Sequence, residues 1–545
     1  MWRNSLITVR VLGVVLLGSV AATAALLWGT SIPLGVPGEW TWPRLPGTVE
    51  TLGGGAGALA AGVLYISFVL WRRRGIVSRS RRAMLGWLSA LVAASFAWLW
   101  IVQQSVPEPA DLGKVPYILF YPRSSGYFWQ ARYEVANTAD FLAHYEELLA
   151  ERDYLHIGTH PPGLTLSYRG VLALCESSPG LCDAILWTCP ESARESLRSI
   201  RELSAQSGRI VTPADQAAIW FAALITLSAS AATVVGIYVL VHRHFDRAAA
   251  WTAAGLWPLV PAIAVFHPKS DTLFPFVAVT AAALWMRACD RRSLGRAFLA
   301  GCVLWVGMML SLAFATIGLV ITAMTVWEWS IQRSSAGLPE EQRPGEPFAA
   351  RGKALLLAAG AAGFIVPTVG LGVLGEINLL NVWRWNLANH ALFYEHNART
   401  AWKWLAVNPL ELAMAVGLPT AWAAGASLWQ MMRSRTLVSG SAGTAAGFAV
   451  VWALLWLLGK NMGEAARLWI LLMPWVVMSA APLLRCECAR GPSPSPRVQA
   501  SGPWRVTPAA LILTAQMIVC ILTVLRIDGF HFTELVESLA PATAR

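Results

Sequence analysis

The sequence predicts an all-α membrane protein with about 13 transmembrane helices. Hydrophobic residues make up 56% of the chain and charged residues only 13%, whereas a soluble domain is typically about 25% charged. The mean hydropathy is +0.51. The net charge is +11, and the arginines are confined to short segments between apolar runs. That distribution is typical of a polytopic membrane protein and excludes the even basic surface of a nucleic-acid binder.

A transmembrane helix needs roughly 20 predominantly apolar residues. Runs of this kind lie at 8–28, 54–71, 83–104, 216–241, 249–266, 272–289, 354–374, 410–431, 443–459, 468–484 and 507–525. The first run is longer than the apolar core of a secretory signal peptide, so we expect it to be a first transmembrane helix.

A further apolar segment, 297–331, is too long for one helix. We expect two short spans with a break near Leu312, because the charge distribution requires it. Arginine and lysine mark cytoplasmic loops, and six arginines fill the short segment 72–82. Only with the break do all later basic loops fall on the same side as this segment. The N-terminus is then cytoplasmic, and we predict a multi-pass protein of a bacterial cell (inner) membrane.

This topology divides the chain into alternating membrane and loop regions. They are N-terminal helices (1–104), a large outer loop (105–213), central helices (214–331), a cytoplasmic loop (332–353) and C-terminal helices (354–545) that include the outer loop 376–409. Two further outer segments are 267–271 and 459–468. Seven of the nine histidines lie on this outer face. Polar residues near membrane depth are costly and usually functional, so we expect the chemistry on the non-cytoplasmic face.

The large outer loop contains two predicted surface helices. In 137–153, NTADFLAHYEELLAERD, apolar side chains recur at helical spacing and Asn137 is a suitable N-cap. The apolar positions are Phe141, Leu142, Tyr145, Leu148 and Leu149. The next stretch, YLHIGTHPPGLTLSYRG (154–170), predicts a second helix after His160 with proline at its first position.

This order of elements resembles the first outer loop of the protein O-mannosyltransferases. In that family an acidic residue and a surface helix precede His-Pro-Pro-Leu and a further helix. Here HPPG occupies 160–163, with glycine in place of leucine, and Asp140 lies twenty positions before His160. The aminoarabinose transferases have a related Pro-Pro element. The turn HPKSD, which ends in Asp271, and GEAARLWILLMP (463–474) are similar to further elements of this group.

The resemblance implies a GT-C fold and a glycosyltransferase (a hexosyltransferase) that uses a polyprenyl-phosphate sugar donor. The acceptor would be a glycan, lipid or protein at the non-cytoplasmic face. The sequence has no P-loop or Rossmann fingerprint, which agrees with a lipid-linked donor. Such a reaction needs a carboxylate to take the proton of the acceptor hydroxyl and cations to stabilise the leaving phosphate.

These requirements select the candidate site residues. Candidate catalytic residues are Asp140, Glu134, His160 and Asp271, and candidate substrate-binding residues are Arg384, His390, His396, Arg399, Lys460, Glu464 and Arg467. Each has a structural alternative. An acidic residue such as Asp140 stabilises the start of its own helix, Glu134 can pair with Arg132, and Arg467 can pair with Glu464 alone. Lys269 is interpreted as an interfacial anchor.

Other ligands and functions are open at this stage. We predict no cofactor, because the histidines of the third outer segment are too loosely spaced for a metal site. Cys175, Cys182 and Cys189 share the outer loop and allow one disulfide with three pairings. The competing functions are a transporter or lipid flippase and a non-catalytic envelope assembly protein. A transporter would place charges at the bilayer midplane, often in repeats, and an assembly protein would need no cationic pocket.

Overall fold

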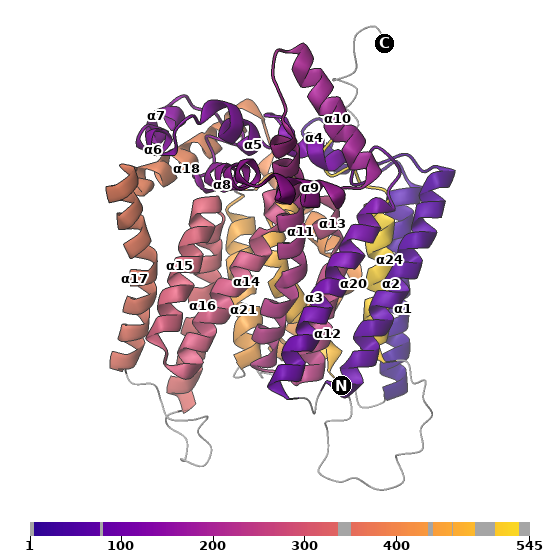
Figure 1. Cartoon of the computed structure of the whole chain (residues 1–545). Coiled ribbons are helices and arrows are strands. Elements are labelled where there is room, and N and C mark those ends of the chain that lie inside the picture. The colour runs from indigo at the N-terminus through magenta and orange to yellow at the C-terminus, as the bar shows by residue number, and fades with distance from the viewer. Residues whose placement is uncertain are drawn as a thin grey trace.

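The computed structural model describes residues 5–76, 80–335, 350–433, 440–459, 461–485 and 507–532. The described chain is mostly helical, which confirms the predicted all-α class. Its only strands there form one antiparallel hairpin, β1 (Leu34–Val36) and β2 (Trp40–Trp42). Long helices stand side by side as a bundle, and a layer of shorter helices lies across one end of it (Figure 1).

The bundle and the layer use different parts of the chain. The bundle contains α1 (Ser5–Ala24), α2 (Val49–Gly75), α3 (Arg81–Gln104), α11 (Pro213–His242), α12 (Arg247–Leu256), α14 (Phe274–Arg291), α15 (Leu294–Leu310), α16 (Phe314–Ser335), α17 (Ala350–Gly375), α20 (Leu418–Arg433), α21 (Gly440–Leu457), α23 (Met473–Ser479) and α24 (Pro508–Val524). The layer contains α4 (Lys114–Phe120), α5 (Tyr127–Trp129), α6 (Thr138–Ala143), α7 (Tyr145–Ala150), α8 (Gly163–Ser177), α9 (Pro179–Trp187), α10 (Glu191–Gln206) and α18 (Leu379–His396). Short elements join them: η1 (Ala25–Gly29), η2 (Gln130–Glu134), η3 (Trp257–Leu259), α13 (Pro261–Val265), η4 (Ser270–Thr272), α19 (Ala401–Val416), α22 (Ala465–Leu468), η7 (Ile470–Leu472) and η8 (Ala481–Leu484).

Six helices in the described residues are long and apolar enough to cross a membrane. A bent pair, α19 and α20, would make a seventh, although its halves meet at 111°. Other predicted spans correspond to shorter apolar helices. The structure therefore supports a multi-pass membrane protein, and it corrects the expectation that every apolar run forms one full-length helix.

Prolines and one glycine cause the interruptions. The predicted span 249–266 is divided between α12, η3 and α13, where Pro258 and Pro261 each stand at the start of a new helical segment. Proline cannot donate its backbone amide and breaks a continuing helix. The predicted span 410–431 is broken at Gly417, whose φ of +96° favours glycine. The predicted span 468–484 is likewise split into η7, α23 and η8.

A buried glutamine on α24 satisfies the backbone groups that two of these breaks leave unpaired. Gln516 donates from Nε2 to the carbonyls of Val416 (2.8 Å) and Leu259 (3.0 Å). Its Oε1 accepts from the backbone amide of Thr420 at 3.2 Å. Irregular backbone at membrane depth requires such internal partners, so Gln516 allows α19 to turn away from α20 and lie at the end of the bundle.

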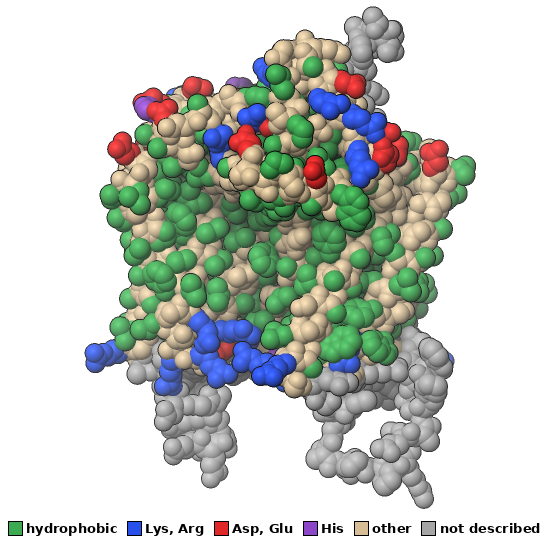
Figure 2. Space-filling model, in the orientation of Figure 1, with side chains coloured by type: hydrophobic (Ala, Val, Ile, Leu, Met, Phe, Trp, Pro, Cys, Tyr) green, Lys and Arg blue, Asp and Glu red, His purple; other side chains and the backbone are tan. Residues whose placement is uncertain are grey.

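The break near Leu312 is confirmed. Helix α15 ends at Leu310 and α16 begins at Phe314. The two ends of the bundle also differ in charge. A dense group of lysine and arginine side chains lies at the end opposite the layer, the layer carries acidic and histidine side chains together with further lysines and arginines, and an apolar band separates the two ends (Figure 2).

The two surface helices differ slightly from the prediction. The expected helix 137–153 is divided at His144 into α6 and α7, and Asn137 caps α6 by accepting from the amide of Ala139 at 2.8 Å. Leu142, Tyr145 and Leu149 are buried in a cluster against α18, which confirms the predicted apolar face. Helix α8 begins at Gly163, two positions later than expected, and Pro162 precedes it.

Candidate functional site

A polar cavity of about 480 Å³ lies at the layer end of the bundle. All four predicted outer segments contribute to its wall, together with the β hairpin and residues 529–531. The charged and histidine side chains that line it are Glu39, Arg123, His156, His160, Lys269, His390, Arg399, Glu464, Arg467 and His531. Segments that are more than 400 residues apart in the sequence, such as the hairpin and Arg467, thus meet around one polar space.

Two buried asparagines of α18 hold the loop that contains the HPPG motif. Asn386 donates to the carbonyls of Gly158 (3.0 Å) and His160 (3.1 Å). Asn389 donates to the carbonyls of Leu149 and Gly158, both at 3.0 Å. A buried carbonyl without a partner is costly, so these four hydrogen bonds fix the path of residues 149–160 and the position of His160 at the cavity.

The HPPG motif also needs a small residue where it enters α8. A Cβ atom on Gly163 would lie 2.3 Å from the carbonyl oxygen of Met309 on α15. Only glycine allows this close approach of two backbones. The glycine that replaces the leucine of the resembled family therefore places the start of α8 directly against the end of α15.

The histidines of the motif loop are neutral at physiological pH. Burial lowers the pKa of His160 to about 4, although Asp271 opposes the shift. Burial, followed by repulsion from Lys269 and Arg467, holds the pKa of His156 well below its usual value. His160 Nδ1 lies 3.0 Å from the carbonyl of His156, and His156 Nε2 lies 3.2 Å from the carbonyl of Arg123. The two rings therefore contribute hydrogen bonding to the wall and no charge.

Lys269 belongs to the cavity, contrary to its interpretation as an interfacial anchor. It is 6% exposed, and its Nζ donates to the carbonyl of Ser124. The pKa of Lys269 is lowered to about 7, mainly by burial and also by the neighbouring Arg467, while Asp271 and Glu464 oppose both effects. The lysine can therefore gain or lose its charge near neutral pH.

Arg467 and Glu464 form an ion pair on the wall. Arg467 NH2 lies 2.7 Å from Glu464 Oε2, and the side chains are 15% and 22% exposed. The chain enters α22 through two residues with positive φ, Gly463 (91°) and Glu464 (55°). The Nε of Arg467 is buried without a hydrogen-bond partner among the described residues, and so is the Nε of Arg399. The wall thus carries guanidinium donors that the described protein does not satisfy.

Asp271 is a predicted carboxylate that does not itself line the cavity but is a neighbour of residues that do. It precedes α14 in η4 and interacts electrostatically with His160, Lys269 and Arg467, which all line the cavity. Within the described residues its carboxylate makes no side-chain hydrogen bond or ion pair. A partly exposed, uncommitted carboxylate beside cationic groups is suited to accept a proton from a bound hydroxyl group.

Asp140 and Glu134 do not line the cavity. Asp140 lies in the first turn of α6, where its side chain is 73% exposed and pairs with His144 at 3.2 Å. Glu134 is exposed at the end of η2. Its expected partner, Arg132, instead contacts Asp215 and Glu176. The spacing from the HPPG motif therefore does not bring these two carboxylates to the cavity wall.

The remaining predicted residues are divided between the cavity and its surroundings. His390 and Arg399 line it. His396 is exposed and stacks on Tyr154, a wall residue, with ring centroids 4.4 Å apart. Arg384 is exposed on α18 and does not line the cavity. Lys460 lies outside the described residues.

The hairpin is the part of the site that sequence analysis missed. Glu39 accepts from the Thr400 hydroxyl (2.6 Å), the Thr400 amide (2.8 Å) and the Trp404 indole (2.8 Å). The two Thr400 hydrogen bonds are the main cause that lowers the pKa of Glu39 to about 2. Through these hydrogen bonds the Glu39 carboxylate joins the hairpin to α19. The Trp-Thr-Trp alternation after Pro-Gly (37–42) was the available signal for a hairpin.

An apolar cavity of about 240 Å³ adjoins the polar one. The residues that line it include Leu27, Leu34, Trp42, Val265, Leu410 and Ala466. The two spaces are lined by sequence neighbours, since Ala466 lines the apolar cavity and Arg467 lines the polar one. Trp40 lines the polar cavity and Trp42 lines the apolar one, and the centroids of their rings are 5.6 Å apart.

The cysteines and potential metal ligands add no further site. Cys175, Cys182 and Cys189 are buried free thiols in this structure, and Cys182 Sγ donates to the carbonyl of Cys175 at 3.0 Å. No group of three or more His, Cys, Asp or Glu side chains in the described ranges is arranged to hold a metal ion. The sequence matches no model of a known protein family and no curated protein.

Proposed function

We propose that this protein is a GT-C-type glycosyltransferase that moves a sugar from a polyprenyl-phosphate donor to an acceptor hydroxyl group. The observation that carries the proposal is the junction of a cationic cavity and an apolar cavity at Ala466 and Arg467. A polyprenyl-phosphate sugar has an anionic phosphate between a polar sugar and an apolar tail. The phosphate fits the cationic wall and the beginning of the tail fits the apolar space.

In this proposal the phosphate is bound by Arg467, Arg399 and Lys269. The two arginines offer Nε donors without partners, and a guanidinium matches phosphate oxygens in a two-pronged way. These cations stabilise the phosphate as it leaves the anomeric carbon. Glu464 keeps Arg467 oriented and prevents its side chain from extending into solvent.

Asp271 is proposed as the general base. It takes the proton of the acceptor hydroxyl while the hydroxyl oxygen forms a bond to the anomeric carbon, and the bond from that carbon to the phosphate oxygen breaks. The products are the glycosylated acceptor, polyprenyl phosphate and a protonated Asp271. The neutral imidazole of His160 lies beside Asp271 and is available to hydrogen-bond a sugar hydroxyl.

The position of the charges favours this function over the alternatives. Both cavities lie at one end of the bundle, whereas a transporter needs its polar site near the middle of the membrane with access to both sides. A non-catalytic assembly protein has no need of an uncommitted carboxylate among buried cations. The basic residues at the opposite end support a non-cytoplasmic position of the cavity, by the positive-inside rule.

The function can be tested with purified protein in lipid vesicles. The vesicles are incubated with a polyprenyl-phosphate donor that is labelled in its sugar and with an extract of acceptor lipids and glycans. We expect the label to move to an acceptor and polyprenyl phosphate to accumulate. Movement of intact labelled donor across the vesicle membrane without sugar transfer would identify a flippase and contradict the proposal. A Met462→Cys variant labelled only from the cytoplasmic side would overturn the proposed orientation.

A further inference from the structure

A second charged surface lies at the end of the bundle opposite the cavity. Helix α14 starts beside Asp271 and runs for 18 residues to Arg291, so its last turn is roughly 25 Å away along the axis. Four exposed arginines meet there: Arg81 at the start of α3, Arg287 and Arg291 near the end of α14, and Arg296 in the first turn of α15. Figure 2 shows basic side chains gathered at this end. We call these four residues the basic cluster.

The basic cluster has little balancing negative charge among the described residues. Arg287 lies close enough to Arg296, Arg81 and Arg291 to be repelled by all three, and Asp290 opposes this repulsion. None of the four makes a side-chain hydrogen bond or ion pair with the described residues. Like charges brought together at helix ends without a counter-charge favour binding of an anion.

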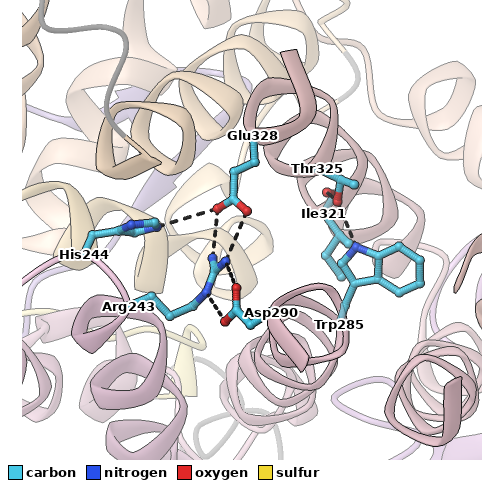
Figure 3. A network of polar contacts seen from close by, with 7 residues as sticks. All are labelled: Arg243, His244, Trp285, Asp290, Ile321, Thr325 and Glu328. Carbon is cyan, nitrogen blue, oxygen red and sulfur yellow. Dashed lines mark hydrogen bonds and ion pairs between the residues drawn. The ribbon is translucent and has the colours of Figure 1, made fainter. Parts of the chain in front are cut away.

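Asp290 is already committed to another arginine. Arg243, just after α11, donates from Nε (2.9 Å) and NH2 (2.7 Å) to the two oxygens of Asp290 (Figure 3). The same guanidinium donates to both oxygens of Glu328 on α16 at 2.9 and 3.1 Å. Arg243 therefore joins α11, α14 and α16, and it occupies both oxygens of Asp290, the carboxylate beside Arg291.

Apolar side chains are exposed one turn from the arginines. Leu85 follows Arg81 by four residues on α3 and is 59% exposed, and Leu299 follows Arg296 by three residues on α15 and is 52% exposed. Residues three or four apart share a helix face. An anionic headgroup at the basic cluster would therefore have its acyl chains against exposed leucines of the same helices. A free phosphate ion would gain nothing from these leucines.

We propose that the basic cluster is a binding site for an anionic phospholipid of the membrane leaflet at this end. The headgroup phosphate lies between Arg287 and Arg296, with Arg81 and Arg291 as further cations, and the acyl chains lie along α3 and α15. Arginine is suited to phosphate because its guanidinium donates two parallel hydrogen bonds, and basic pockets between helix ends recognise anionic headgroups. This inference does not depend on the proposed sugar transfer.

The test uses the full-length protein in a neutral detergent with added phosphatidylglycerol, phosphatidylcholine or inorganic phosphate. Native mass spectrometry measures bound lipid, and thermal unfolding measures stabilisation. The variant is Arg287→Gln with Arg296→Gln. The matched control is Arg351→Gln with Arg433→Gln, which removes two exposed charges from the same end of the bundle but outside the basic cluster.

We expect the wild-type protein and the control to retain phosphatidylglycerol and to be stabilised by it. The variant should bind it about 30-fold more weakly, because each arginine near the headgroup contributes on the order of 1 kcal/mol. If this variant does not fold, Arg287→Lys with Arg296→Lys should bind with intermediate affinity. Equal phosphatidylglycerol binding by variant and control would overturn the proposal. Equal stabilisation by inorganic phosphate or by phosphatidylcholine would overturn it as well.

Discussion

The guanidinium of Arg467 lies 2.7 Å from the carboxylate of Glu464, three residues earlier, and its Nε has no partner among the described residues. Glu464 holds the arginine in place on the cavity wall, and the proposal assigns the remaining donor to the phosphate of the lipid donor. Helix α22 begins directly after Glu464, with Ala466 lining the apolar cavity and Arg467 lining the polar one.

Substitution Arg467→Lys tests the phosphate role of this arginine. The change keeps the positive charge but removes the two-pronged geometry. We expect the KM for the donor to rise about tenfold, equivalent to about 1.4 kcal/mol of lost interaction, with little change in melting temperature. Steady-state kinetics and thermal unfolding of the same preparation give both values. A destabilised Arg467→Lys protein with the wild-type KM would show that the arginine only stabilises the fold.

The charge of Lys269 should make donor binding depend on pH. Its pKa is lowered to about 7 by burial and by Arg467. A phosphodiester donor keeps its negative charge throughout this range, so binding should be strongest below pH 7, where Lys269 is protonated. Affinity should fall as the pH rises through 7. Titration of donor binding between pH 5.5 and 8.5 measures this profile.

The variant Lys269→Arg is the control for this pH profile, because arginine stays charged at all these pH values. Its donor affinity should be nearly constant across the range. If wild-type protein and Lys269→Arg lose affinity in parallel above pH 7, the titrating group is not Lys269.

Two glycines of α8 provide a matched pair for the HPPG motif. A Cβ at Gly163 would meet the Met309 carbonyl at 2.3 Å, whereas a Cβ at Gly170 meets no atom within 4 Å. Gly163→Ala should therefore reduce the free energy of unfolding by about 1–3 kcal/mol. Gly170→Ala should leave it unchanged or raise it by up to about 1 kcal/mol, because alanine is the better helix former. Denaturation of the two proteins side by side decides this, and equal stabilities would refute the close packing of α8 against α15.

Asn386 should stabilise the motif loop. Its replacement by alanine leaves the carbonyls of Gly158 and His160 with fewer hydrogen-bond donors. We expect Asn386→Ala to lower the free energy of unfolding by about 1–3 kcal/mol and to reduce sugar transfer, because His160 loses its fixed position. Arg384→Gln, an exposed change on the same helix, serves as the control and should be neutral. A neutral Asn386→Ala would mean that the loop is held by other contacts.

Sequence alone predicted the parts of the structure that depend on local pattern. Apolar runs located α2, α3, α11, α14 and α17 to within a few residues, because burial in a bilayer needs long apolar helices. The arginine distribution predicted the break that is observed between Leu310 and Phe314. The same arginine distribution predicted that the four outer segments lie on one side, and all four contribute to the polar cavity.

The parts that were not predicted depend on contacts between distant segments. The turn at Gly417 is stabilised by Gln516, which lies 99 residues later. Lys269 is a cavity residue because its neighbours include Ser124 and Arg467, from other outer segments. Asp140 lies on the exposed side of α6, since the apolar side of α6 and α7 packs into a cluster with α18.

The most direct test of the central claim compares sugar transfer by Asp271→Asn and Asp140→Asn. Both changes remove one negative charge from the same face of the protein, but only Asp271 lies beside the cavity residues. The account predicts that purified Asp271→Asn binds the polyprenyl-phosphate sugar but transfers it at least about 100-fold more slowly, as expected for a lost general base. Asp140→Asn should transfer at close to the wild-type rate. Near-normal transfer by folded Asp271→Asn, or loss of transfer in Asp140→Asn alone, would contradict the account.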